Sequence, residues 1–420
     1  MGLLVMAKAD MAILRDVEGR EYIDGLAGLF TTQVGHGREE IARAVADQLT
    51  KLDFVSLFGF AHEPAIELAA RLAELTPGDL SVVNFANSGS EAVEVAIKIA
   101  RQYHYIRGER NRVKIIARAG AFHGVTFGAL SATGVRLRRA PYEPLVPGFV
   151  HVPPPDGYHT YPNLSEGEVA DAALRALEET LDFEGPDTVA AMIVDPIMAA
   201  IGVIVPPACY LPRLKEICDR HRILLIIDEV LTGFGRSGKL FACEHWGVVP
   251  DIMTMAKGLS SGYQPIAATI VTEKIAEPFE GSYFQHGQTF SGHPAGCRAA
   301  LTNLAIIERE HLVKNAADVG DYLLSRLQKL RDLPLVGDVR GKGLLLGIEL
   351  VSDKKRHQKF PDAAEVGFRV RDRAIELGLI CRSDNDCIIL APPLILDRIQ
   401  ADRIAEILAQ AIAEVGQSVE

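Results

Sequence analysis

Lys257 is the residue of this 420-residue chain with the clearest potential for covalent chemistry. It follows the apolar stretch 252–256 and precedes a Gly/Ser-rich turn at 258–262. An amine at the end of a short strand, partly desolvated and beside a backbone that a ligand can approach, can form a Schiff base with an aldehyde. A lone lysine that opens a loop is far more often a surface residue, so the assignment depends on other motifs.

Asp228 is the second candidate. It ends the continuous apolar run 223–227, which is typical of a strand buried on both faces in a parallel sheet. Ligands of open α/β sheets bind at the carboxyl ends of the strands, although an acid there is about as often an N-cap or a surface group. A buried Asp that keeps a pyridine nitrogen protonated and a Lys that carries an aldehyde cofactor are the pair that pyridoxal phosphate (PLP) requires.

A phosphate cradle is expected at Ser88, Gly89 and Ser90, which lead into a helical pattern. Backbone N–H groups at a helix N-terminus, with the helix dipole and hydroxyl groups, bind a dianion without a basic side chain. The same residues also form a Ser-x-x-Glu capping signature, and both roles can hold together. Phe122 and His123 follow the apolar strand 113–117, where Phe122 is placed to stack on a pyridine ring, although core packing is commoner for one aromatic residue.

The order of these motifs carries a resemblance to a known family. Together they resemble the class III (omega) aminotransferases of PLP fold type I, from about residue 13 to the C-terminus, and the matching segments are 87–92, 122–124, 228–230, 233–236, 256–258 and 288–294. Within that family the chain is most similar to the amine:pyruvate omega-transaminases, through residues 202–207, 289–294, 379–382 and 391–393. Several separate motifs in one order are far more specific than any one of them.

The resemblance implies a role for each matching residue. Around the cofactor, these are Lys257 as the Schiff-base lysine, Asp228 as the partner of the pyridine nitrogen, Phe122 and Val230 on the two ring faces, His123 beside them, and Ser88, Gly89 and Ser90 at the phosphate. Thr289 is expected to reach the phosphate of a neighbouring subunit, which implies a homodimer with shared active sites, or a tetramer. For the substrate, the resemblance implies that Arg382 receives a carboxylate and that Phe30 and Phe58 form aromatic walls.

The chain departs from the family pattern at three places. Phe122 stands where relatives often have Tyr, and Asp195 replaces the Glu of a Glu-Pro pair. Relatives also carry a further N-terminal segment, so part of the covering of the pocket or of the dimer edge is expected to be absent. These departures bear on substrate range more than on the chemistry.

The implied activity is that of an aminotransferase, a transferase of nitrogenous groups. It would move an amino group from an amine or omega-amino acid to pyruvate by a ping-pong reaction through pyridoxamine phosphate. Other class III activities stay open, with beta-alanine, taurine, 4-aminobutyrate or a diamine as donor or 2-oxoglutarate as acceptor. So do, with less support, a PLP aminomutase or decarboxylase and a non-catalytic PLP-binding protein.

An NAD-dependent dehydrogenase is a rival from another class, because residues 233–238 satisfy G-x-G-x-x-G after a strand. Two acids separate that strand from the glycines, however, and no apolar-periodic helix follows promptly. No strand-end acid follows about twenty residues later, so the dinucleotide site is disfavoured.

Composition agrees with a metabolic enzyme. The chain is 48% hydrophobic with a net charge of −11, which suits one large and one small domain and opposes nucleic-acid binding. No apolar run approaches the roughly 18 residues of a membrane helix, and no signal peptide is evident, so a cytoplasmic location is expected. The six cysteines contain no C-x-x-C pair and the twelve histidines show no ligand spacing, so no metal is expected.

The expected fold class is α/β, with a large domain built on a mixed, mostly parallel sheet and a smaller α+β domain. Residues 13–24 are expected to form a hairpin, 142–162 a long loop, and 341–350 and 388–390 two strands. The predicted division is 1–38 as the N-terminal part of the small domain, 39–296 as the PLP-binding domain and 297–420 as the rest of the small domain.

Overall fold

The computed structural model of the protein describes residues 3–418. A seven-stranded sheet forms its centre, in the order β4-β10-β9-β8-β7-β5-β6. The bounds of these strands are β4 Leu80–Ala86, β5 Lys114–Arg118, β6 Phe149–Val152, β7 Val189–Val194, β8 Leu224–Asp228, β9 Ile252–Met255 and β10 Ala267–Thr272. Strand β10 runs antiparallel to both of its neighbours, whereas β6, β5, β7, β8 and β9 are mutually parallel. The sheet is therefore mixed and mainly parallel.

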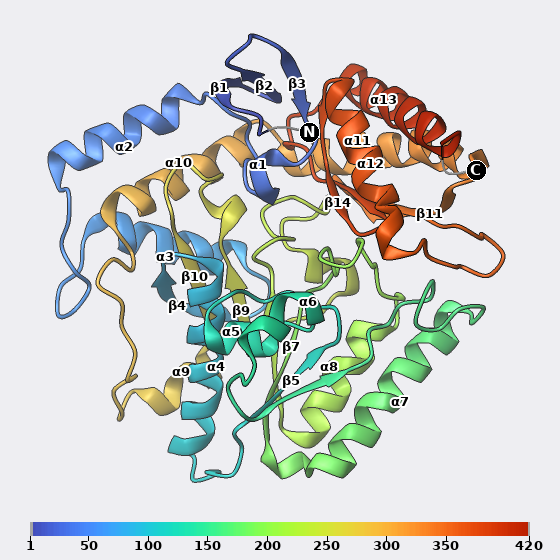
Figure 1. The fold of residues 1–420 in the computed structure, drawn as a ribbon. Helices are drawn as coiled ribbons and strands as arrows, with labels where there is room; N and C mark the ends of the chain where they lie inside the picture. Colours follow the sequence, from blue (N-terminus) through green and yellow to red (C-terminus); the bar gives the residue numbers. More distant parts are fainter. Residues whose placement is uncertain (1–2, 419–420) are drawn as a thin grey trace.

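Burial explains why the central strands are so apolar. Every residue of β7 and β8 is buried, because helices cover the sheet and leave neither face to water. Helices α7 Glu166–Glu184 and α8 Tyr210–His221 connect β6, β7 and β8 as crossovers and lie side by side along the sheet (Figure 1). The strands predicted at 223–227 and 252–256 are confirmed as β8 and β9, so both end at the same edge of the sheet.

Two smaller sheets lie beside the large one. Their orders are β1-β2-β3-β13 and β11-β12-β15-β14. Their bounds are β1 Met6–Asp10, β2 Ile13–Asp16, β3 Glu21–Asp24, β11 Val336–Lys342, β12 Leu345–Leu350, β13 Leu379–Ile380, β14 Arg382–Asp384 and β15 Cys387–Leu390. The hairpin predicted over 13–24 is confirmed as β2 and β3, and β3 also pairs in parallel with β13. In Figure 1 the blue N-terminal strands accordingly lie beside the red C-terminal elements.

The other helices complete the layers around the sheets. They are α1 Ala27–Phe30, α2 Glu39–Lys51, α3 Glu63–Leu75, α4 Gly89–Ile106, α5 Phe127–Ala132, α6 Arg136–Arg139, α9 Glu273–Ala276, α10 Pro294–Arg309, α11 Leu312–Gln328, α12 Val366–Glu376 and α13 Arg398–Gly416. No helix within residues 3–418 is long and apolar enough to cross a membrane.

Two details of the predicted elements are wrong. The stretch 341–350 is not one strand, because β11 ends at Lys342 and a turn at Gly343, with φ of +54°, leads into β12. A Cβ on Gly320 of α11 would lie 2.3 Å from the Gly343 backbone, so the helix packs directly against this turn. The stretch 142–162 is not only a loop either, since it contains β6, which pairs with β5 at the edge of the large sheet.

Candidate active site

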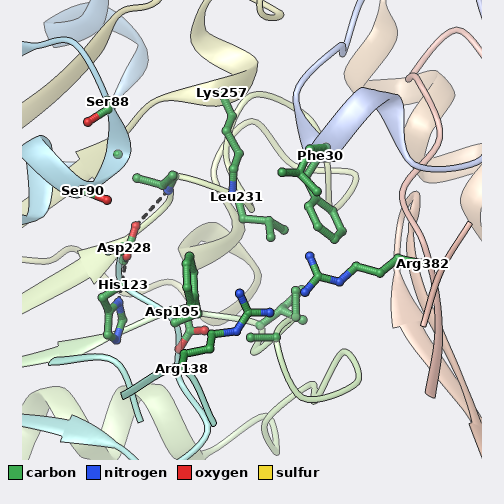
Figure 2. Close-up of a pocket in the computed structure, with 18 residues that line it drawn as sticks. Phe30, Ser88, Ser90, His123, Arg138, Asp195, Asp228, Leu231, Lys257 and Arg382 are labelled. Carbon is green, nitrogen blue, oxygen red and sulfur yellow. Dashed lines mark hydrogen bonds and ion pairs between the residues drawn. The ribbon is translucent and has the colours of Figure 1, made fainter. Parts of the chain in front are cut away.

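A cavity of about 260 Å³ opens at the carboxyl ends of the parallel strands (Figure 2). It receives side chains from the segments that follow β4, β5, β7, β8 and β9, as expected for an open α/β sheet. The residues predicted for the site that line it are Phe30, Ser88, Gly89, Ser90, Phe122, His123, Asp228, Val230, Lys257 and Arg382. Thr289 and Phe58 are not among its lining residues.

Only Ala256 separates Lys257 from the end of β9. Lys257 is the first residue of a short 3₁₀ turn. Its φ of +41° lies in the left-handed region, an uncommon conformation that the surrounding packing holds in place. The pKa of the amine is lowered to about 8, mainly by burial. The negative charge of Asp228 raises this pKa, whereas the positive charges of Arg382 and Arg236 lower it further. A substantial share of Lys257 is therefore neutral near pH 8, the state in which the amine is nucleophilic.

Asp228 is held in one orientation by three donors. His123 Nδ1 lies 2.8 Å from Oδ2, while Thr254 Oγ1 and the backbone N–H of Val230 donate to Oδ1 at 3.0 and 3.1 Å. The carboxylate is only 4% exposed. The buried Nε2 of His123 has no hydrogen-bond partner within residues 3–418. These three contacts fix the direction of the carboxylate, and a buried acid oriented in this way can pair with a protonated ligand nitrogen.

The N-terminus of α4 forms a backbone cradle. Ser88 is the N-cap and accepts from the Glu91 N–H at 3.3 Å, and Ser90 Oγ accepts from the Val125 N–H at 3.0 Å. Gly89 has no room for a side chain, because a Cβ there would lie 2.7 Å from Val230 Cγ1. The cradle thus brings main-chain N–H groups and two hydroxyls to the cavity, which suits a phosphate.

These residues fit PLP. Asp228 would supply the acid for a pyridine nitrogen, Lys257 the amine for an aldehyde, and the start of α4 the anion site. Phe122 and Val230 supply apolar surface between them. The cofactor expected from the sequence therefore matches the donors and the apolar surfaces that this cavity presents.

The opposite side of the cavity is mostly apolar and carries Arg382. Phe30, in the left-handed backbone region with φ of +61°, places its ring 5.6 Å from Lys257 Nζ and 5.9 Å from the guanidinium carbon of Arg382. Leu231, Ile197 and Ala199 complete this wall. A small substrate between Lys257 and Arg382 would thus contact Phe30.

Phe58 and Thr289 lie outside this cavity. Phe58 is 50% exposed and packs beside Gly287, so it does not line the cavity of its own chain, and its role as a second aromatic wall stays a prediction. Thr289 is exposed on the neighbouring segment 280–293. The two segments are tied together, since His62 Nε2 contacts the Gly292 carbonyl oxygen at 2.8 Å.

Two charged lining residues had no site role in the sequence-based prediction. Arg138 of α6 places its guanidinium carbon 5.0 Å from the centre of the Phe122 ring. Its sequence context, three arginines within residues 136–139, resembles a solvated surface and carries no signal of a pocket. Asp195 also lines the cavity, where the fully buried Arg118 donates to its Oδ1 at 2.8 Å.

Comparisons with known proteins agree with this fold. The family model "Aminotransferase class-III" matches residues 1–412. A putrescine–pyruvate aminotransferase of Pseudomonas aeruginosa is 37% identical, over 100% of this chain and 92% of its own.

Solved structures show the same fold. An (S)-enantioselective omega-transaminase from Thermomicrobium roseum is 44% identical with a TM-score of 0.97, over 99% of this chain and 93% of its own. An amine transaminase from an uncultivated Pseudomonas species, solved in its PLP-bound form, is 40% identical with a TM-score of 0.96, over 99% of this chain and 96% of its own. The expected α/β architecture of PLP fold type I is confirmed.

Proposed function

Since the chain belongs to the class III aminotransferases, we propose that it moves an amino group from an amine or an omega-amino acid to pyruvate, with PLP as its cofactor. The observation that carries the proposal is the pairing of Lys257 and Arg382 across one cavity, with the Phe30 ring between them. An amine-reactive group and a carboxylate-binding group then share one substrate space.

The proposed roles follow from the contacts. PLP, when bound, supplies the electron sink that removal of a proton beside nitrogen requires. Asp228, oriented by His123 and Thr254, keeps the ring nitrogen protonated. Lys257 Nζ attaches the cofactor and, once a substrate amine has displaced it, carries the proton away from the substrate carbon that bears nitrogen. Its lowered pKa of about 8 suits this exchange near neutral pH.

Substrate binding uses the other wall. The planar fork of Arg382 offers two parallel hydrogen bonds to the carboxylate of pyruvate or alanine. A neutral amine has no carboxylate and would pack on Phe30 and Leu231. One pocket thereby accepts two chemically different partners in alternate half-reactions.

We further propose a homodimer in which Thr289 completes the phosphate site of the second copy. The exposed segments near Phe58 and Thr289 support this, since they lie together and present aromatic side chains to solvent. The exposed fractions are 50% for Phe58, 68% for Phe60, 65% for Tyr283 and 59% for Phe290. Apolar surface gathered in this way is typical of a protein interface. The predicted domain division stays a proposal, to which the β3–β13 pairing gives support.

The proposal is tested with the PLP-loaded protein and a panel of amines, each with pyruvate or 2-oxoglutarate as acceptor. Chromatography should detect alanine formed from pyruvate, and the purified protein should absorb above roughly 400 nm through its lysine-bound cofactor. Lys257→Ala should abolish both, whereas Lys239→Ala, at an exposed loop lysine, should change neither. Formation of glutamate from 2-oxoglutarate, without alanine from pyruvate, would identify 2-oxoglutarate as the acceptor. If the protein binds the cofactor but forms no amino acid from either acceptor, transamination is contradicted.

A further inference from the structure

Two arginines, and not one, face the substrate side of the cavity. Arg138 lies on α6, which follows β5 and α5, and Arg382 lies on β14 near the C-terminus. Figure 2 shows their guanidinium groups approaching each other from two sides, with Phe30 and Leu231 above them. The two charges are close enough that, after burial, Arg138 is the main cause of a lowered pKa at Arg382.

Each guanidinium is held by an aromatic ring. The Arg138 carbon lies 5.0 Å from the centre of Phe122 and the Arg382 carbon 5.9 Å from the centre of Phe30. Such contacts orient a planar cation without neutralising it. Within residues 3–418, neither arginine has a carboxylate oxygen within 4.0 Å.

The carboxylates that line the cavity are already engaged. Asp195 accepts from the buried Arg118 at 2.8 Å, and Asp228 accepts from His123 and Thr254. Neither is therefore free to balance the pair of arginines. The charge of Asp384 on β14 acts on both arginines, but its carboxylate lies more than 4.0 Å from each guanidinium. Two like charges at a partly desolvated site are costly unless an anion joins them, because charges removed from water need partners.

We propose that Arg138 is a specificity-determining residue, which forms with Arg382 one recognition site for the anionic end of the amine donor. The matching donors are short omega-amino acids that end in a carboxylate or a sulfonate. A diamine would place its second ammonium group against two guanidinium groups and is rejected. This inference rests on the proposed aminotransferase function and specifies its donor class.

The geometry also limits donor length. The cavity holds about 260 Å³ and the cofactor takes part of it. The amine must reach Lys257 while the anion reaches the arginines, and Phe30 lies beside both of these end points. A short carbon chain between nitrogen and anion suits this space.

The first test compares donors in single-turnover reactions without acceptor, so that pyruvate binding does not contribute. Wild-type protein should react faster per unit concentration with beta-alanine and taurine than with putrescine. Arg138→Gln should lower the apparent second-order rate constant for beta-alanine and taurine by roughly tenfold or more, as loss of one charge-assisted contact implies, and leave 1-phenylethylamine within about twofold. Arg138→Lys keeps the charge and loses the planar stack, so its rate constants for beta-alanine and taurine should lie between those of the wild type and Arg138→Gln.

Arg136→Gln is the matched control. Arg136 belongs to the same four-residue helix, but it is exposed and does not line the cavity. Its substitution removes the same charge from the same helix and should leave all donors unchanged. Equal losses for Arg136→Gln and Arg138→Gln would overturn the inference, because they would reduce the effect to net charge.

The second test measures binding without chemistry. Propionate and propanesulfonate carry the anion but no amine, and calorimetric titration of the PLP-loaded protein gives their affinity. Arg138→Gln should weaken both by roughly tenfold. If no donor is transaminated but the anions still bind through Arg138, the proposed function fails alone. If transamination proceeds with putrescine as the better donor, or if Arg138→Gln slows every donor equally, this inference fails alone.

Discussion

His123 Nδ1 lies 2.8 Å from Asp228 Oδ2, so the carboxylate proposed to hold the cofactor nitrogen is itself held by an imidazole. The pair comes from two strand ends, β5 and β8, that are separated by β7 in the sheet. A ligand at Asp228 therefore experiences a carboxylate whose direction is set before binding.

Substitutions at this pair should differ in severity. Asp228→Asn is nearly isosteric but removes the charge, so the single-turnover rate should fall by several orders of magnitude. His123→Phe keeps the carboxylate and loses only its orientation, so the rate should fall by roughly ten- to a hundredfold. Absorbance spectra give the PLP occupancy of each variant. A loss below tenfold for Asp228→Asn at full occupancy would remove Asp228 from its role.

The amine of Lys257 should set a pH dependence. Burial lowers its pKa to about 8, so the amine is protonated and unreactive below that pH. Covalent capture of PLP by the cofactor-free protein, trapped with borohydride and followed by mass spectrometry, should accelerate as pH rises through about 8 and level off above it. A lysine at its ordinary pKa would still be accelerating near pH 10.

The lowered pKa of Lys257 also determines how the stability of the protein changes with pH. The folded protein holds this proton more weakly than the unfolded chain, whose lysine has the ordinary value of 10.5. The free energy of unfolding of the cofactor-free protein should therefore decline as pH falls from about 10.5 to about 8, and this contribution should change no further below that. Lys257→Met should flatten this part of the pH profile in denaturant titrations.

Gly89 should be sensitive to a single methyl group. The new Cβ of Gly89→Ala would meet Val230 Cγ1 at 2.7 Å, so either the start of α4 or Val230 must shift, which disturbs the cradle. PLP affinity, measured by absorbance titration, should fall by roughly tenfold, since loss of aligned N–H groups costs about 1.4 kcal/mol or more. Gly89→Ala combined with Val230→Ala should recover part of the loss. Gly167→Ala, where nothing lies within 4 Å of the new Cβ, should have no effect.

Hybrid dimers test whether the active sites are shared. Thr289→Glu places a negative charge where the phosphate of the second copy is proposed to lie, and Lys257→Ala removes the amine. Each homodimer should be inactive. In a hybrid of the two chains, both substitutions fall in one active site and the other active site keeps Lys257 and Thr289. Mixing the two variants should therefore restore activity. No recovery in verified hybrids would place Thr289 outside the site of the second copy.

Much of the cavity follows from strand patterns alone. Continuous apolar runs end at Asp228 and beside Lys257, and parallel strands bring their carboxyl ends to one edge. Local sequence therefore sufficed to predict that these side chains line one pocket with Ser88–Ser90. Their distances, and the tie from His123 to Asp228, depend on how neighbouring strands twist and could not be predicted.

Other features depend on tertiary packing that leaves no local pattern. Arg136 and Arg138 are chemically identical and two positions apart, yet only Arg138 packs on Phe122. The turn at Gly343 packs directly against Gly320 of α11, a contact that strand propensity does not encode. The placement of Phe58 depends on a segment more than two hundred positions away, around Gly287.

The cavity draws on both ends of the chain, since Phe30 follows β3 and Arg382 follows β13, and these two strands pair. During translation, the N-terminal hairpin leaves the ribosome long before its partner strand has been made. A nascent chain cannot assemble the substrate wall until β13 and Arg382 have been made, and closure of so long a loop is slow. The large sheet can form earlier, so newly made protein should acquire its PLP-binding cradle before it acquires substrate selectivity.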